Sequence, residues 1–290
     1  MGRRARDGKR IVTPAPTTRF RMLLLAVALT PLAAACASDA HAPTPPTASV
    51  LGATATRTAA PSPATETTAP GTTEATSTPV QPAGVVTRGD PSRRVVALTF
   101  DAGADAGFTR EILDTLRSEG VRASFSVTGL WAEQNRDLLL AITADGHQLI
   151  NHTYDHASFT GPSTGRPPLT AAERALELSR TETTVYHLTQ RSTRPYFRPP
   201  YGDIDEGVRR DAAAAGYGTI VMWTVDSLGW NHATADEIVA RCLAQAEPGA
   251  IYVMHVGSES QDAAALPRVI AGLRADGYAF VTIDELLAGG

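Results

Sequence analysis

The chain is poor in cysteine, and lysine is nearly absent from it. Its 290 residues include 2 cysteines and 26 lysines and arginines together, and only Lys9 is a lysine. Cys242 is the one cysteine after residue 36, so the C-terminal part cannot form an internal disulfide, and we expect Cys242 to pack on a helix face. The formal net charge of −4 is small, which gives no indication of a nucleic-acid partner.

The sequence also lacks an apolar run long enough to cross a membrane. The run at 22–35, MLLLAVALTPLAAA, has 14 residues, whereas a membrane-spanning helix needs about 20. Basic residues precede this run and small residues end it, which predicts a secretory signal over residues 1–36. The small residues directly before Cys36 resemble a bacterial lipoprotein signal, which predicts a lipid on Cys36; cleavage near Ala35 without lipidation is the alternative.

Aromatic residues are absent from residues 37–90, where threonine, alanine and proline dominate. Such a composition buries too little apolar surface to offset the entropy of an ordered chain. We therefore predict a disordered linker over 37–90. Aromatic and strand-like segments are concentrated in 91–290, which is long enough for one well-buried domain.

No GxGxxG motif or phosphate-binding loop follows a strand-like segment, which argues against nucleotide binding. Strand-like runs instead alternate with helical segments. Strands are expected at 94–100, 122–129, 148–150, 194–198, 218–225, 250–256 and 279–283, and helices at 109–120, 132–146, 170–188, 205–215, 234–245 and 262–276. Such an α/β pattern of about seven units predicts a mostly parallel sheet with outer helices, and favours a small β/α barrel over an open doubly wound sheet.

Polar motifs follow five of the expected strands. They are Asp101, NHTYDH at 151–156, RPPYG at 198–202, DSLGW at 226–230 and His255. The C-terminal ends of strands in a β/α barrel meet on one face, where active sites form, so we expect these residues to converge. His152 and His156 have the i, i+4 spacing that points two imidazoles the same way on a helical turn, as a metal site requires. Two loop histidines without a ligand are the alternative for this pair.

These motifs resemble the ordered motifs of one known family. They read TFDAG at 99–103, HTYDH at 152–156, RPPYG at 198–202, DSLGW at 226–230 and VMH at 253–255. Over residues 93–287 the chain is similar to the NodB-homology polysaccharide deacetylases, carbohydrate esterase family 4. The resemblance implies a distorted (β/α) barrel and a metal-dependent hydrolase that removes N- or O-acetyl groups from polysaccharides.

The resemblance also implies roles for individual residues. Asp101 matches the general base that takes a proton from the attacking water, and Arg198 matches the arginine that keeps this base ionised. His255 matches the general acid that protonates the leaving group, and Asp226 matches the carboxylate that orients and charges His255.

The metal ligands and the acetyl pocket are assigned in the same way. His152 and His156 match the ligands of a divalent metal, with zinc expected and cobalt as the alternative, which activates water and polarises the acetyl carbonyl. Tyr201 matches the residue whose backbone N–H binds the oxyanion. Trp230 and Val253 match the walls of the acetyl pocket.

The first motif departs from the family pattern. Family members have a second aspartate there that binds the metal, and Ala102 stands in its place. Catalytic zinc usually has three protein ligands, so three hypotheses follow. Asp105 turns back as the third ligand, or water or Asp101 fills the position, or the domain binds glycan without catalysis. The Gly- and Pro-rich segment 159–170 is a second departure, which either shapes substrate choice or only connects two elements.

A secreted deacetylase held at the outer face of a bacterial membrane by a lipid on Cys36 would meet cell-envelope glycans. N-acetylated peptidoglycan is therefore the expected substrate, with chitin oligomers and acetyl xylan as alternatives, because the family shares its acetyl-handling residues among them. A non-catalytic glycan-binding module is the alternative class of protein, and it predicts binding without acetate release.

Overall fold

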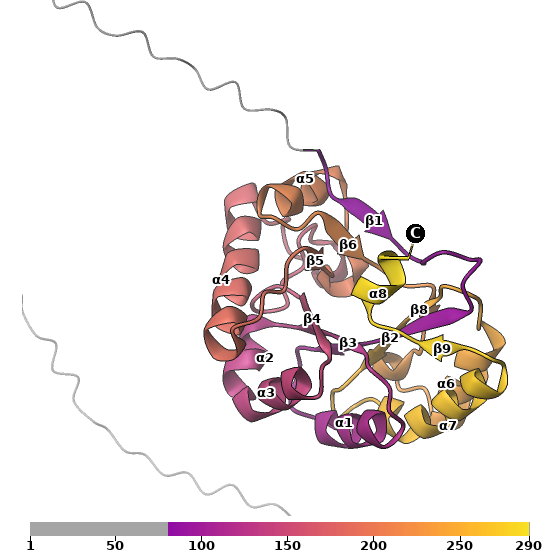
Figure 1. Ribbon diagram of the computed structural model, residues 1–290. Helices are drawn as coiled ribbons and strands as arrows, with labels where there is room; N and C mark the ends of the chain where they lie inside the picture. The colour runs from indigo at the N-terminus through magenta and orange to yellow at the C-terminus, as the bar shows by residue number, and fades with distance from the viewer. Residues whose placement is uncertain (1–80, 290) are drawn as a thin grey trace, which may run out of the picture. The chain divides into compact units, whose positions relative to one another are not determined.

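Residues 81–289 are the part of the chain that the computed structural model describes (Figure 1). The strands are β1 (Gly84–Val86), β2 (Val95–Ala102), β3 (Ser124–Val127), β4 (Gln148–Asn151), β5 (Tyr196–Phe197), β6 (Thr219–Val221), β7 (Val225–Asp226), β8 (Ile251–His255) and β9 (Ala279–Phe280). The α-helices are α1 (Thr109–Ser118), α2 (Gly129–Gln134), α3 (Arg136–Ala144), α4 (Ala171–Thr189), α5 (Glu206–Ala214), α6 (Ala235–Ala244), α7 (Asp262–Ala275) and α8 (Ile283–Leu287). Short 3₁₀ turns are η1 (Pro162–Thr164), η2 (Pro200–Gly202) and η3 (Gly229–Asn231).

The strands form one parallel sheet that curls into a half-barrel. Their order is β1–β6–β5–β4–β3–β2–β8–β7, and β9 pairs with the start of β2. Every pairing between these strands is parallel. Within residues 81–289 no pairing joins β1 to β7, so the curled sheet stays open. The predicted distorted (β/α) barrel is therefore confirmed, with helices around the sheet (Figure 1).

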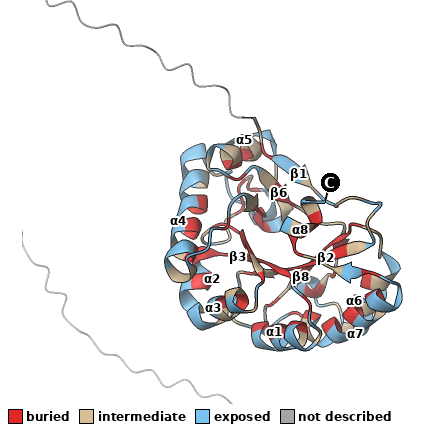
Figure 2. Ribbon diagram, in the orientation of Figure 1, coloured by how far each residue is buried: buried red, intermediate tan, exposed pale blue. Residues whose placement is uncertain are grey.

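Strand β2 shows how the core and the site share one element. Leu98, Phe100 and Ala102 are fully buried and join the main apolar cluster with residues of the outer helices (Figure 2). Side chains alternate along a strand, so Thr99 and Asp101 point to the opposite, inner face of the curled sheet. The helix-facing residues thus anchor the strand. On the inner face Ala97 joins a smaller apolar cluster, and Thr99 and Asp101 are left for polar contacts.

The element boundaries differ from the predicted ones in four places. The strand expected at 279–283 is shortened to β9, and residues 283–287 form helix α8, which was not predicted. The helix expected at 132–146 is two helices, because Asn135 has a non-helical backbone and separates α2 from α3. The strand expected at 218–225 is divided into β6 and β7. Residues 84–86, predicted to lie in the linker, form β1 and pair with β6. Three residues are too few to leave a periodic signal, so this strand depends on its tertiary partner.

The predictions for the N-terminal segments concern residues that the structure mostly does not describe, whereas those for membrane spans and Cys242 can be compared with it. The signal segment 1–36 and most of the linker lie outside the described residues. Within the described part, no helix has the length and apolar character needed to cross a membrane. Cys242 is a buried free thiol on α6 and packs in the main apolar cluster, as predicted.

Candidate active site

Nearly all of the predicted site residues line one cleft of about 680 Å³ at the C-terminal edge of the sheet. Those in its wall are Asp101, Asp105, His152, His156, Tyr201, Asp226, Trp230, Val253 and His255. Arg198 is the exception, because it is fully buried and contacts Asp101 from within the protein. Strands β2, β4, β7 and β8 end at this edge or run into loops that line it, which brings residues far apart in sequence together.

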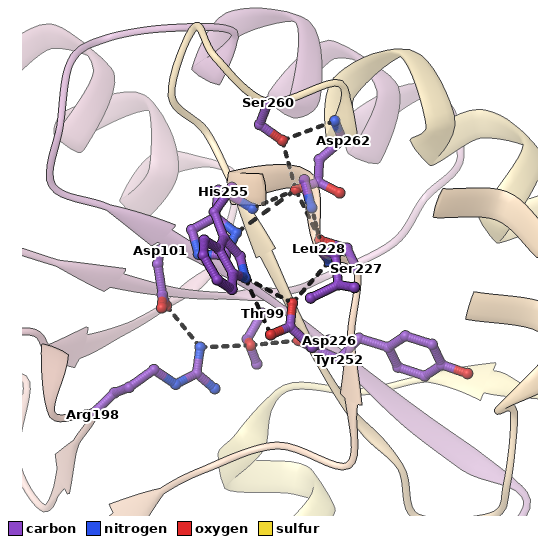
Figure 3. A network of polar contacts seen from close by, with 12 residues as sticks. Thr99, Asp101, Arg198, Asp226, Ser227, Leu228, Tyr252, His255, Ser260 and Asp262 are labelled. Atoms are coloured by element: carbon purple, nitrogen blue, oxygen red, sulfur yellow. Dashed lines mark hydrogen bonds and ion pairs between the residues drawn. The ribbon is translucent and has the colours of Figure 1, made fainter. Parts of the chain in front are cut away.

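The buried Arg198 forms an ion pair with Asp101, which is partly exposed at the edge of the cleft (Figure 3). Arg198 Nη1 lies 2.7 Å from Asp101 Oδ1 and also donates to Thr99 Oγ1 over 2.8 Å. Arg198 Nε donates to the Val221 carbonyl over 3.1 Å, which fixes the guanidinium. Burial alone would raise the pKa of Asp101, but the charge of Arg198, followed by the neighbouring His152 and His255 and the Arg198 hydrogen bond, outweighs burial and lowers this pKa to about 2. Asp101 is therefore ionised at neutral pH.

His152 and His156 lie on a loop after β4, and the chain forms no helical turn there. Thr153 and His156 each have a φ of 66°, in the left-handed region. The two imidazoles still meet edge to face, with ring centroids 4.9 Å apart. His152 Nδ1 lies 2.8 Å from the Arg198 carbonyl oxygen. Because a carbonyl oxygen only accepts, Nδ1 carries the proton and Nε2 keeps its lone pair.

Both histidines are electrically neutral at pH 7. Burial lowers the pKa of His152, although the neighbouring Asp101 carboxylate opposes this shift. Burial, together with the nearby His152, lowers the pKa of His156 to about 3. Neutral imidazole is the form that ligates a metal ion.

Polar side chains hold the histidine loop in its left-handed conformation. Asn151 Oδ1 accepts from the Thr153 N–H over 2.9 Å, and Thr153 Oγ1 accepts from the His156 N–H over 3.1 Å. The buried Glu177 of α4 accepts from the Tyr154 N–H over 2.8 Å and from the Asp155 N–H over 3.1 Å. A Cβ at Gly103 would lie 3.3 Å from the His156 ring. The absence of a side chain at Gly103 therefore leaves space for the His156 imidazole.

His152, His156 and Asp101 carry the donor atoms that a divalent metal binds, but within residues 81–289 the three side chains are not placed as a ready-made three-ligand site. His152 Nε2 lies 3.7 Å from Asp101 Oδ2. Two ligands of a tetrahedral zinc ion, each about 2.1 Å from it, are about 3.4 Å apart. The donor set is two neutral imidazoles and an ionised carboxylate, which is chemically suited to zinc.

Asp105 does not lie where the first ligand hypothesis puts it. Its Oδ1 accepts from the Ser258 N–H over 3.0 Å, and its Oδ2 accepts from the Ser258 hydroxyl. Within residues 81–289, no group of three or more His, Cys, Asp or Glu side chains is arranged to hold a metal. Both Asp105 oxygens bind the loop after β8, so Asp105 links two sides of the cleft rim here.

Aromatic side chains form much of the outer wall of the cleft. Tyr201 has a φ of 61°, and its ring packs edge to face on His156 with centroids 4.8 Å apart. Trp230 is 54% exposed, which leaves its indole face open to a ligand. Trp230 Nε1 donates to the two Asp226 oxygens over 3.3 and 3.2 Å, and the Leu228 N–H donates to Asp226 over 2.8 Å. Asp226 thus holds Trp230 in place.

His255 ends β8 directly opposite Asp101 of β2. A carboxylate that the sequence analysis missed, Asp262, lies behind its ring, with His255 Nδ1 3.8 Å from Asp262 Oδ2. Burial would lower the pKa of His255, but the carboxylates of Asp262, Asp101 and Asp226 outweigh burial and raise it. Asp262 was missed because an acidic residue in the first turn of a helix is ordinary. Its complete burial, which only the fold reveals, marks it as unusual.

The Gly- and Pro-rich segment 159–170 reaches the rim of the cleft. Ser163 in this segment lines the cleft and donates to Asp203 Oδ1 over 2.6 Å. Ser158 donates to the other Asp203 oxygen. Asp203 directly follows the RPPYG motif, so the segment is tied to the site. This contact favours a part in shaping the cleft over a plain connection.

The arrangement combines a proton acceptor with a proton donor across one cleft. Asp101 is ionised, and His255 on the neighbouring strand has a raised pKa, which favours its protonated form. A small group bound between them can lose a proton to one residue and gain a proton from the other, which is general acid–base catalysis. The two neutral histidines on a third side are free to bind a metal ion.

Sequence comparisons place this arrangement among known proteins. A family model described as polysaccharide deacetylase matches residues 88–220. The peptidoglycan-N-acetylmuramic acid deacetylase PdaA of Bacillus subtilis is 32% identical over 202 residues, which cover 69% of this chain and 73% of that protein. A peptidoglycan-N-acetylglucosamine deacetylase of Bacillus cereus is 31% identical over 212 residues, which cover 72% of this chain and 95% of that protein.

A solved structure adds a relative of a different kind. The CE4 family pseudoenzyme from Bacillus anthracis is similar with a TM-score of 0.64 and 29% sequence identity. The match covers 70% of this chain and 68% of that one. Similar sequences and folds thus occur both in proteins named as deacetylases and in one described as a pseudoenzyme.

Proposed function

Because this chain belongs to the polysaccharide deacetylase family, we propose that it removes N-acetyl groups from the sugars of peptidoglycan. The observation that carries this proposal is the Asp101–Arg198 ion pair beside His255 in one cleft, with His152 and His156 on its other side. The names of the two Bacillus relatives support peptidoglycan as the substrate.

In the proposed reaction, Asp101 and His255 move the protons. Asp101 takes a proton from the water that attacks the acetyl carbonyl carbon, and Arg198 keeps Asp101 ionised for this step. His255 then gives a proton to the sugar nitrogen as the carbon–nitrogen bond breaks. The products are acetate and a free amino sugar, so all atoms of the amide and the water are accounted for.

The proposed metal site consists of His152 and His156, with water or the Asp101 oxygen that faces His152 in the third position; water would hold this position while Asp101 accepts the proton. A bound zinc or cobalt ion would supply Lewis-acid activation of water and of the acetyl carbonyl. The hydrogen bond from His152 Nδ1 to the Arg198 carbonyl supports this assignment, because metal-binding histidines are usually oriented by such a partner. We propose that Ala102 stands at the position where family members carry another metal-binding aspartate.

Three further residues are proposed to hold the acetyl group and the sugar. Tyr201 would present its backbone N–H to the oxyanion. Trp230 and Val253 would enclose the methyl group, with Asp226 fixing the indole of Trp230. The placement of Tyr201, Trp230 and Val253 in one cleft wall supports these roles.

The proposed location is outside the cell. Residues 1–36 would act as a secretory signal, residues 37–80 as part of a tether, and a lipid on Cys36 as the anchor to the outer face of the membrane. Growth with a labelled fatty acid tests the anchor, because wild type would take up label and Cys36→Ala would not. Unlabelled wild-type protein would contradict the lipid anchor and leave the deacetylase proposal unaffected.

Acetate release from different glycans tests the proposed activity. We expect the purified chain, supplied with zinc, to release acetate from peptidoglycan fragments faster than from chitin oligomers or acetyl xylan. Asp101→Asn keeps the shape of the base but removes its charge, so we expect at least about a 100-fold lower rate. Binding of the fragments without acetate release from any substrate would instead support a non-catalytic glycan-binding module.

A further inference from the structure

Asp262 is a fully buried carboxylate whose two oxygens have very different surroundings. Its Oδ2 accepts from Ser260 Oγ over 2.8 Å, from Ser227 Oγ over 3.1 Å and from the His255 N–H over 2.8 Å (Figure 3). Its Oδ1 is buried and has no hydrogen-bond partner within the described residues. Such an orphaned buried oxygen is rare in folded proteins and calls for an explanation.

His255 also has a buried polar atom without a hydrogen-bond partner. Its Nδ1 is buried without a partner among the described residues, and it lies 3.8 Å from Asp262 Oδ2. The ring and the carboxylate are already joined through the backbone, because the His255 N–H donates to Asp262. A small rotation of either side chain would let Nδ1–H donate to Asp262 and would satisfy a buried donor with a buried acceptor.

Asp226 is already engaged elsewhere. Its two oxygens accept from the Trp230 indole and from the Leu228 N–H. No hydrogen bond between Asp226 and His255 occurs in the part of the chain that the structure covers. The two carboxylates near His255 therefore have separate structural partners, with Trp230 on one and the His255 backbone on the other.

The glycine of the DSLGW motif is explained by Asp262. A Cβ at Gly229 would lie 2.4 Å from Asp262 Oδ2 and 2.3 Å from Ser260 Oγ, which is closer than real atoms approach. Gly229 is buried and has no positive φ, so backbone conformation gives no reason for glycine at this position. The absence of a side chain at Gly229 makes space for Asp262 behind His255.

We propose that Asp262 is the positioning residue of His255, accepting a hydrogen bond from Nδ1–H so that Nε2 faces the cleft. Asp226, by contrast, orients the Trp230 wall. Only the catalytic consequence of this assignment rests on the proposed function: in that reaction, His255 Nε2 delivers a proton to the leaving nitrogen. The orientation and tautomer of His255 are properties of the protein alone and can be measured without any reaction.

The tautomer of His255 is measured by long-range proton–nitrogen NMR on the purified full-length chain, with the signal assigned from the spectrum of His255→Gln. We expect wild type to carry the shared proton on Nδ1, with a downfield resonance. Asp262→Asn should abolish this resonance, and the matched variant Asp226→Asn should retain it. A wild-type spectrum with the proton on Nε2 alone, or a resonance lost only in Asp226→Asn, would overturn the proposal.

Kinetics on peptidoglycan fragments test the consequence of the same contact. Asp262→Asn should lower kcat on the order of 100-fold with KM changed less than about 3-fold, because a misplaced acid affects the transition state and not substrate binding. Asp262→Glu should restore part of kcat. An unchanged kcat in Asp262→Asn, or an effect on KM alone, would contradict the positioning role.

The two measurements separate this proposal from the proposed function. A wild-type chain that releases no acetate contradicts the proposed function, whereas the NMR spectrum still decides whether Asp262 holds His255. Where Asp262→Asn fails to fold, as circular dichroism would reveal, Gly229→Ala offers a second way to displace the Asp262 carboxylate. Gly229→Ala should weaken the Nδ1–H resonance, and an unaltered resonance in folded Gly229→Ala would count against the contact.

Discussion

At the scale of single residues, the first motif places two neighbours in opposite environments. Asp101 is paired with the buried Arg198 at the cleft, and Ala102 is fully buried in the main apolar cluster. A carboxylate at position 102 would therefore lose hydration unless a cation compensated it. Alanine leaves the apolar cluster intact, and the proposed metal would then have the two histidines as ligands, with water or Asp101 in the third position.

Ala102→Asp tests whether position 102 can reach the metal. Because Ala102 is the last residue of β2, a carboxylate at this position can turn out of the apolar cluster toward the histidines. We then expect the variant to bind zinc at least about 10-fold more tightly in calorimetry, because a third dedicated ligand completes the site. Without metal it should be less stable to urea than wild type, since its carboxylate is then buried without a partner. Ala102→Ser is the matched control, and Asp105→Ala should bind zinc like wild type. Equal zinc affinity in Ala102→Asp and Ala102→Ser would show that position 102 does not reach the ion.

The residues of the site were largely predictable, and the exceptions have physical causes. Asp101, His152 and His255 could be found because a polar residue at the end of an apolar strand stands out in the sequence. Asp262 stands in the first turn of α7 and gives no such signal, because its importance comes from burial behind His255. The direction of the Asp105 side chain depends on Ser258, which is 153 residues away in the chain.

At the scale of elements, the segment around β4 links the core to the histidine loop. His147, directly before β4, is buried and its Nδ1 accepts from the Ala123 N–H over 3.1 Å. Its proton therefore lies on Nε2, which is buried without a partner among the described residues. Burial lowers the pKa of His147 to about 4. This histidine is folded into the protein in its neutral form.

The neutral state of His147 predicts acid sensitivity of the fold. The pKa of His147 is 6.5 in the unfolded chain and about 4 in the folded protein. Between these two pH values the unfolded chain binds a proton at His147 that the folded protein does not bind, so the free energy of unfolding falls as pH falls. From pH 7 to pH 5 this one group should cost about 2 kcal/mol in the free energy of unfolding. His147→Asn can accept the same Ala123 N–H without titrating.

Urea unfolding at pH 7 and pH 5 measures this difference. Wild type should lose about 2 kcal/mol more than His147→Asn over that interval. The buried His152 and His156 remain in both proteins, so their contributions cancel in the comparison. Equal losses in the two proteins would mean that His147 is not held neutral by the fold.

Most elements could be predicted from the sequence, and those that could not depend on distant partners. The buried run of β2 and the capping box of Thr170 and Glu173 at the start of α4 follow from local patterns and are present. Strand β1 exists because it pairs with β6, and its three residues carry no pattern of their own. The i, i+4 spacing of the two histidines does not reveal the left-handed conformations of their loop, which depend on contacts with Asn151 and Glu177.

At the scale of the whole molecule, the curled sheet explains how one cleft gathers residues from most of the domain. Parallel strands end at the same edge of the sheet. Motifs that lie between positions 101 and 255 therefore meet at one cleft, although they are far apart in the sequence. Outer helices bury the opposite side of each strand and leave the inner face for Asp101 and its partners. The fold is common to relatives named as deacetylases and to a pseudoenzyme, so the fold alone does not decide between catalysis and binding.

Metal-dependent acetate release tests the central claim most directly. The purified chain would be treated with a chelator, divided, and assayed on peptidoglycan fragments with and without added zinc or cobalt, beside His156→Ala as the ligand variant. We predict that chelation stops acetate release, that added metal restores it in wild type, and that His156→Ala stays inactive at the same metal concentration. Metal-loaded wild type that binds the fragments but releases no acetate would contradict the deacetylase account.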